Sequence, residues 1–225
     1  NACLRLWDSM TNRRMYITCS IGTSGFLERF TADYDLPNNT NYSETCASVG
    51  LMMFGQRMAD LTGEASYYDV VERALYNTLL SGISQTGDRY FYVNPLEVVP
   101  EFCTEHTYMK HVKAVRQKWF SVACCPPNVA RTLASLGQYI YAQDDKGIYI
   151  QQFITSEFTG NPSIRMESSL MESGKVKIHV SGCKGRRTLH IRIPDYAQDI
   201  VFMMDGKEGN GSVRRGALET EVDTG

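Results

Sequence analysis

The spacing of apolar residues changes once along this chain, near residue 145, and this change limits the fold more than any other feature. Apolar side chains recur every three to four residues over 46–61, 71–83 and 129–140, which predicts amphipathic helices. Beyond Asp144 the period falls to two over 148–150, 176–180, 189–193 and 200–204. Such short runs, bounded by Gly, Asp and Asn, predict strands, the last of which turns at Asp205 and Gly206. We therefore expect an α+β fold, helical over 1–145 and an antiparallel β-sandwich over 146–225.

Charge and hydropathy exclude several classes of protein. The 225 residues include 23 Lys and Arg against 25 Asp and Glu, and 43% are hydrophobic, which is typical of a globular chain rather than a disordered one. Neither sign of charge dominates a long stretch, so nucleic acid and anionic membranes are not expected partners. No apolar run reaches the roughly 18–20 residues of a membrane-spanning helix.

Seven cysteines, an odd number in a chain of this length, argue against a small disulfide-stapled domain. Cys124 and Cys125 are adjacent and make a poor disulfide, because a vicinal bridge strains the peptide between them. They stand just before the predicted third helix, whose N-terminus favours thiolates. Two readings remain open: thiols kept for chemistry or metal, and two buried cysteines packed as small apolar groups.

Glu44 and Cys46 form a second cluster of candidate ligands. On a regular helix, side chains two residues apart point about 200° apart, so they converge only if the segment is extended or just entering a helix. Ser43 is a candidate N-cap at that point. One carboxylate with three thiolates would make a four-ligand zinc set. The alternative is that Glu44 faces the helix dipole and Cys46 belongs to the core.

A competing metal set has weaker support. Cys103 and His106 have C-x-x-H spacing and His111 is close, but no fourth ligand is evident and lysines stand nearby.

The long irregular segments 17–43 and 84–125 are where functional residues are expected. Glu28 lies in a Gly-containing loop beside Phe26 and Leu27, whose apolar surface would raise its pKa toward that of a general acid. A surface ion pair with Arg29 is the alternative. Tyr92 and Asn94 offer a phenol and an amide of the kind that bind a polyol, or they belong to a core strand.

Several motifs, in order, resemble glycoside hydrolase family 127, the β-L-arabinofuranosidases and their relatives. The resemblance is densest over residues 15–50, which contain Glu-Arg-Phe at 28–30, Asp-Tyr-Asp-Leu-Pro-Asn at 33–38 and Glu-Thr-Cys-Ala at 44–47. Further matching motifs occupy 73–77, 92–97, 124–128 and 189–194.

The resemblance implies a fold and a set of roles. The family fold is an (α/α)6 barrel followed by β-sandwiches, and its members are much longer. We therefore expect the later part of the barrel and the start of the β region, with upstream sugar-binding histidines absent. Such a piece would belong to a longer chain or pair with a second copy as a homodimer, because half a barrel leaves apolar helix faces uncovered.

The roles follow motif by motif. Positions matching Glu44, Cys46, Cys124 and Cys125 bind Zn2+ in the family, and the one matching Cys124 is the proposed nucleophile. The positions matching Glu28 and Tyr92 are the general acid/base and a sugar-site tyrosine. The implied activity is a retaining glycosidase that releases β-L-arabinofuranose or a related sugar from an oligosaccharide or other glycoside.

The chain also departs from the family pattern. Cys19 and Ser20 stand where two glycines are common, Leu27 replaces a small residue, and Val122 replaces a cysteine of some relatives. The first two changes should tighten the loop that carries Glu28, because glycine allows backbone angles that Leu disfavours. A non-catalytic zinc-stabilised sugar-binding or scaffold module, or a relative acting on another pectic sugar, is therefore an alternative. Reduced thiols favour the cytoplasm, with periplasm or secretion expected if an upstream segment carries a signal.

Overall fold

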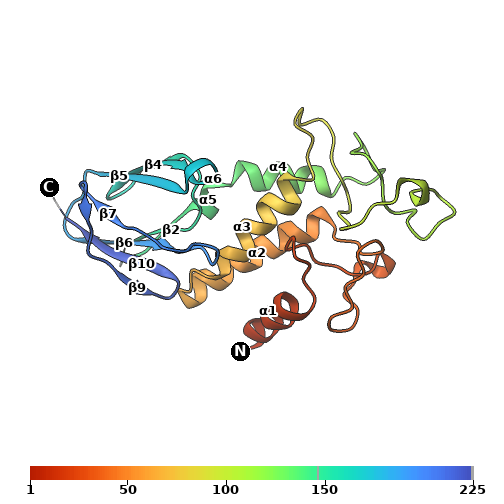
Figure 1. Cartoon of the computed structure of the whole chain (residues 1–225), viewed down its shortest axis with the longest axis horizontal. Helices are drawn as coiled ribbons and strands as arrows, with labels where there is room; N and C mark the ends of the chain where they lie inside the picture. Colours follow the sequence, from red (N-terminus) through yellow and green to blue (C-terminus); the bar gives the residue numbers. More distant parts are fainter. Residues whose placement is uncertain (146, 224–225) are drawn as a thin grey trace. The chain divides into compact units, whose positions relative to one another are not determined.

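The computed structural model describes residues 1–145 and 147–223, which form helices in the first part and mainly strands in the second (Figure 1). The predicted α+β class is thereby confirmed. Two compact units are formed, one by residues 1–58 and 70–134 and the other by residues 59–69 and 135–225.

The single helix that the sequence pattern predicted over 129–140 forms two helices in the structure. The helices are α1 (Ala2–Arg13), α2 (Thr45–Thr62), α3 (Tyr67–Ala74), a π-helical turn (Leu75–Leu80), α4 (Cys125–Ala134), α5 (Gly137–Ile140) and α6 (Leu170–Ser173), with short 3-10 turns at Phe26–Glu28 and Pro100–Phe102. The expected helix over 46–61 is α2. The expected helix over 71–83 is the end of α3 and the π-helical turn, and the one over 129–140 is α4 and α5 with a break after Ala134.

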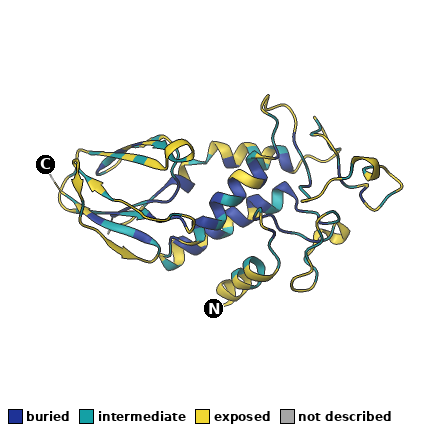
Figure 2. Ribbon diagram, in the orientation of Figure 1, coloured by how far each residue is buried: buried dark blue, intermediate teal, exposed yellow. Residues whose placement is uncertain are grey.

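α2, α3 and the π-helical turn carry about half of the buried apolar residues of the helical region (Figure 2). Met52 and Met58 of α2, and Val71, Leu75 and Leu79 after it, are at most 1% exposed. α1 buries none of its residues and was not predicted. A second, smaller buried cluster is formed by Val93, Met109 and Val112.

The strands form three sheets. They are β1 (Tyr141–Gln143), β2 (Gly147–Ile150), β3 (Ser156–Phe158), β4 (Ser163–Ser169), β5 (Lys175–Ser181), β6 (Arg187–Arg192), β7 (Met203–Met204), β8 (Lys207–Glu208), β9 (Ser212–Arg214) and β10 (Ala217–Val222). The orders are β1-β2-β6-β10-β9, β3-β4-β5 and β7-β8. Ile148, Ile150 and Leu189 of the first sheet share one buried core with Ile164 and Met166 of the second.

Two expectations for the β region need correction. The five-stranded sheet is mixed rather than antiparallel, because β2 and β6 pair in parallel from Gly147 opposite Thr188 to Ile150 opposite Ile191. The chain leaves β2, forms the second sheet and returns in the same direction, which a period of two does not reveal. The run 200–204 forms a strand only at β7, although its turn is confirmed, with positive φ at Asp205 and Gly206.

No helix within the described residues is both long and apolar enough to cross a bilayer.

Candidate metal centre and active site

The backbone at the start of α2 changes from extended to helical between Glu44 and Cys46. Glu44 forms an isolated antiparallel bridge with Val93, and the helix begins at Thr45. This is the geometry in which side chains two residues apart can converge. The predicted N-cap is wrong, because the Ser48 N–H donates to the carbonyl of Glu44 and the Ser43 hydroxyl accepts from Ser20 instead.

Asn94 explains why this junction is fixed. Its amide donates to the Ser43 carbonyl at 3.0 Å and to the Thr45 hydroxyl at 3.1 Å, and its backbone N–H also donates to Ser43. The amide that the sequence offered as a sugar ligand is thus engaged in joining segment 91–94 to segment 43–45. Tyr92, two residues earlier, is thereby held beside Glu44.

The two adjacent cysteines lie at the N-terminus of α4, as predicted. The helix begins at Cys125, and the Asn128 N–H donates to the carbonyl of Cys124 at 3.3 Å. Cys125 is fully buried, whereas Cys124 is exposed.

Four candidate ligands converge where these two helix starts meet. Sγ of Cys125 lies 3.4 Å from Sγ of Cys46 and 3.8 Å from Sγ of Cys124. Oε1 of Glu44 lies 3.3 Å from Sγ of Cys124 and 3.8 Å from Sγ of Cys125. All four ligand atoms lie within 4.8 Å of one another.

This donor set fits a four-coordinate metal ion. Metal bonds of about 2.0–2.3 Å in a tetrahedron separate the ligand atoms by roughly 3.3–3.8 Å, which is the spacing of these four pairs of atoms. Three sulfur atoms and one carboxylate suit a borderline-soft divalent ion rather than calcium or magnesium. Within the described residues, the competing trio Cys103, His106 and His111 does not form such a cluster.

Burial makes the two inner thiols poor acids without a cation. It raises the pKa of Cys46 to about 12, against an opposing hydrogen bond from Asn128. It also raises the pKa of Cys125, with the neighbouring cysteines acting in the same direction. A metal ion would supply the positive charge that a cluster of buried thiolates lacks.

Tyr92 completes the exposed side of the cluster. Its hydroxyl oxygen accepts a hydrogen bond from the Cys124 thiol, with 3.2 Å between oxygen and Sγ. Burial, followed by the contact with Cys124, raises the pKa of Tyr92. The phenol therefore stays neutral and able to donate to a thiolate.

Glu28 lies at the end of the 3-10 turn Phe26–Glu28, where the structure corrects one expectation. Phe26 and Leu27 are 66% and 74% exposed and do not bury the carboxyl group, which is itself exposed. Leu27 has φ 58° and Glu28 φ 48°, which are left-handed backbone angles that glycine adopts more readily. Cys19, at the other departure from the family pattern, also has φ 58°. The carboxylate accepts one hydrogen bond, from the Tyr42 hydroxyl at 3.2 Å.

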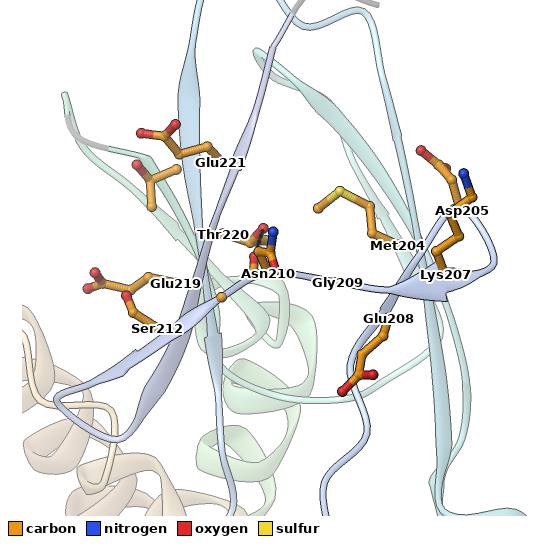
Figure 3. Close-up of a pocket in the computed structure, with 12 residues that line it drawn as sticks. Met204, Asp205, Lys207, Glu208, Gly209, Asn210, Ser212, Glu219, Thr220 and Glu221 are labelled. Carbon is orange, nitrogen blue, oxygen red and sulfur yellow. Dashed lines mark hydrogen bonds between the residues drawn. The ribbon is translucent and has the colours of Figure 1, made fainter.

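A pocket of about 920 Å3 lies elsewhere, among the strands β7–β10 of the second unit. Figure 3 shows its side chains spread over separate strands, with the carboxylates of Glu208 and Glu221 far apart in the view. It lacks the convergence that distinguishes the cluster of Glu44 and the three cysteines.

Comparison with known proteins identifies a matching protein family and a similar protein of known activity. Residues 1–138 match the sequence model of a family described as β-L-arabinofuranosidase, GH127 catalytic domain. A non-reducing end β-L-arabinofuranosidase of Bifidobacterium longum subsp. longum is 39% identical over an alignment 230 residues long. This alignment covers 98% of this chain and 35% of that protein.

Solved structures agree with this result. The crystal structure of a GH127 β-L-arabinofuranosidase from Geobacillus stearothermophilus T6 matches with a TM-score of 0.92 and 42% identity, over 98% of this chain and 36% of that one. A second GH127 β-arabinofuranosidase matches with a TM-score of 0.83 and 30% identity, over 96% and 36%. The chain thus spans about a third of the length of the relatives it matches.

Proposed function

Because this chain belongs to glycoside hydrolase family 127, we propose that the protein carrying it hydrolyses glycosides of β-L-arabinofuranose with Cys124 as nucleophile and Glu28 as acid/base. One observation carries the proposal for this chain's own residues. Among the four clustered ligands, Glu44 and Cys125 are buried, Cys46 is partly buried and only Cys124 is exposed. Its sulfur is therefore the one that a sugar can reach.

We propose zinc as the metal, held by Glu44, Cys46, Cys124 and Cys125. When bound, zinc would keep its sulfur ligands as thiolates at neutral pH. The donor set of three thiolates and one carboxylate supports this choice, because soft sulfur ligands favour zinc over harder divalent ions.

The proposed reaction has two steps with overall retention. Sγ of Cys124 attacks the anomeric carbon, and the bond to the leaving oxygen breaks as the Glu28 carboxyl group gives that oxygen its proton. A sugar is then attached to Cys124 through a C–S bond. The Glu28 carboxylate next takes a proton from water, whose oxygen attacks the same carbon, and the C–S bond breaks to restore the thiolate. Tyr92, which contacts Sγ of Cys124, orients the sulfur and is proposed to contact the sugar.

The test is release of 4-nitrophenol from 4-nitrophenyl β-L-arabinofuranoside by the intact protein. We expect Cys124→Ser to abolish turnover, whereas Cys3→Ser, at an exposed cysteine of α1, should leave it unchanged. Unaltered turnover by Cys124→Ser would show that Cys124 is not the nucleophile. A panel of other pectic glycosides separates an arabinofuranosidase from a relative with another substrate.

A non-catalytic metal-stabilised module is the second candidate. The observation that favours it is the exposed position of Glu28 on a loop with two consecutive residues at positive φ. Binding of one metal ion without sugar release in the same assay would identify it.

We further propose that residues 1–145 are the later part of an (α/α)6 barrel and 146–225 a β-sandwich, which is supported by the helical first part and by the core shared between two sheets. The cytoplasm is the proposed compartment, because reduced thiols persist there. A homodimer is the proposed assembly, since Leu4 and Leu6 of α1 are 44% and 63% exposed.

A further inference from the structure

Tyr42 lies between the loop of Glu28 and the sulfur cluster, although the mechanism above does not use it. Its hydroxyl donates to Oε1 of Glu28 at 3.2 Å. Its ring packs edge-on against Tyr92, with centroids 6.0 Å apart, and stacks on His111 at 6.2 Å. The ring is thus held by two aromatic neighbours, so that its hydroxyl has a defined position.

The loop itself rests on the same ring. A Cβ placed on Gly25 would lie 3.0 Å from the Cδ2 atom of Tyr42, which is closer than ordinary carbon contacts. Glycine at this position allows the backbone of the loop to lie against the ring. The loop is closed by paired backbone hydrogen bonds between Ser24 and Arg29 at 3.1 Å. Glu28 is therefore fixed relative to Tyr42 by the backbone as well as by its carboxylate.

Tyr92, whose ring packs against Tyr42, contacts the sulfur cluster. Tyr92 contacts Sγ of Cys124 with its hydroxyl, at 3.2 Å, and its ring also packs on Phe120, with centroids 5.8 Å apart. Phe120 in turn contacts Tyr90 at 5.0 Å. Five rings therefore contact one another in turn: His111, Tyr42, Tyr92, Phe120 and Tyr90. The hydroxyl of Tyr42 contacts Glu28, and the hydroxyl of Tyr92 contacts Cys124.

We propose that Tyr42 is a positioning residue that sets the place of the Glu28 carboxyl group relative to Cys124. The inference rests on the proposed function, because it assigns Tyr42 a part in delivering the proton from Glu28. An exposed carboxylate on a surface loop otherwise samples several rotamers, and an acid must stand within hydrogen-bond reach of the leaving oxygen to protonate it.

Substrates with different leaving groups distinguish a positioning role of Tyr42 from a role in supporting the fold. A dinitrophenolate leaves readily without a proton, whereas an alkoxide needs one. A displaced acid therefore slows cleavage of an alkyl arabinofuranoside far more than that of a dinitrophenyl one. A general loss of structure slows both equally.

The experiment uses Tyr42→Phe in the intact protein, which keeps the ring and removes the hydroxyl. We expect kcat/KM for a methyl β-L-arabinofuranoside to fall about 5- to 10-fold, the effect of losing one hydrogen bond that holds the neutral acid in place, and that for the 2,4-dinitrophenyl glycoside to fall less than about twofold. Tyr34→Phe, at a tyrosine that is 71% exposed, is the matched control and should change neither.

A double-mutant cycle with Glu28→Gln completes the test. If Tyr42 acts through Glu28, then Tyr42→Phe has no further effect in the Glu28→Gln background. Equal losses on the two substrates, or effects that multiply in the double variant, would overturn the positioning role while leaving the proposed function standing. A Glu28→Gln variant without any dependence on the leaving group would instead overturn the proposed function, and this inference with it.

Discussion

Asn128 donates a hydrogen bond from Nδ2 to Sγ of Cys46 at 3.1 Å, and its orientation is fixed by a second contact. The Arg131 guanidinium, which can only donate, lies 2.7 Å from Oδ1 of the same amide. The oxygen therefore faces Arg131 and the N–H group faces sulfur. This contact opposes the effect of burial on the pKa of Cys46, so it stabilises negative charge on that ligand.

Loss of this contact should weaken metal binding. We expect Asn128→Ala to lower the affinity of the intact protein for zinc by about 10- to 100-fold, the usual effect of removing a group that orients a metal ligand. Competition with a chromophoric chelator measures the affinity without reference to activity. Asn12→Ala, at a surface amide of α1 that contacts Asp8, is the control and should leave affinity unchanged. An unchanged affinity in Asn128→Ala would show that the contact is incidental.

The loop that carries Glu28 should be more stable with glycine at position 27. Leu27 is 74% exposed and has φ 58°, so its side chain contributes strain with little burial. We expect Leu27→Gly to raise the free energy of unfolding by about 0.5–1 kcal/mol. Glycine removes the penalty that a side chain adds to left-handed backbone angles, and the greater entropy that glycine loses on folding offsets part of this gain. Leu61 is similarly exposed, at 73%, but helical, so Leu61→Gly should destabilise instead. Urea midpoints of the two variants give the comparison, and destabilisation by both would contradict the assignment of strain to Leu27.

The cluster of Glu44 with the three cysteines was predictable because its chemistry is unusual. Two adjacent cysteines before a helix, and a carboxylate two residues from a third cysteine, leave few arrangements in which all four converge. The condition stated from spacing alone, that Glu44 be extended and Cys46 be in the first turn, is the one the structure adopts.

Tyr42, Glu28 and β2 show where sequence reasoning stops. Nothing in the sequence distinguishes Tyr42 from twelve other tyrosines, since its importance comes from the folding of two irregular segments against each other. The apolar neighbours of Glu28 indicated burial, but a tight loop with positive φ leaves them exposed. The period of two identified β2 as a strand and carried no information on its direction.

Asp33 should give stability a specific dependence on pH. It accepts from Arg14 at 2.8 Å and from Arg13 at 3.3 Å, joining the end of α1 to the loop at 30–38, and these contacts lower the pKa of its carboxyl group. A carboxyl with a lowered pKa stabilises the fold above its unfolded pKa of about 3.9, and that contribution is lost as pH falls below it. We therefore expect Asp33→Asn to lower Tm near pH 7, and the difference from the unaltered protein to shrink as the pH falls toward 3.

The measurement is a series of thermal unfolding curves between pH 3 and pH 7. Because the pair is exposed, the difference near pH 7 should also shrink in 1 M salt, which serves as the internal control. A difference in Tm that persists unchanged at pH 3 would mean that Asp33 acts through packing rather than charge.

The buried pair of Arg192 and Asp69 should contribute more to stability than any exposed pair. Nη1 of Arg192, whose side chain is 0% exposed, lies 2.6 Å from Oδ1 of Asp69, and Nε of the same guanidinium donates to the carbonyl of Gln151 at 2.6 Å. Burial raises the pKa of Asp69 and the charge of Arg192 opposes that rise. Removing Arg192 therefore leaves a buried carboxylate without its cation.

We expect Arg192→Met to cost about 3–5 kcal/mol, and Arg215→Met, whose exposed guanidinium lies 3.7 Å from Glu64, less than about 1 kcal/mol. The double variant Arg192→Met/Asp69→Leu should recover part of the loss, because no buried charge then remains. In Arg192→Met the pKa of Asp69 rises further, so the folded state binds a proton more tightly than the unfolded one, and stability falls as pH increases. The deficit relative to the unaltered protein should accordingly narrow from pH 7 to pH 5 in denaturant titrations. A deficit independent of pH, or a double variant no more stable than Arg192→Met, would show that the side-chain volume of Arg192 matters more than its charge.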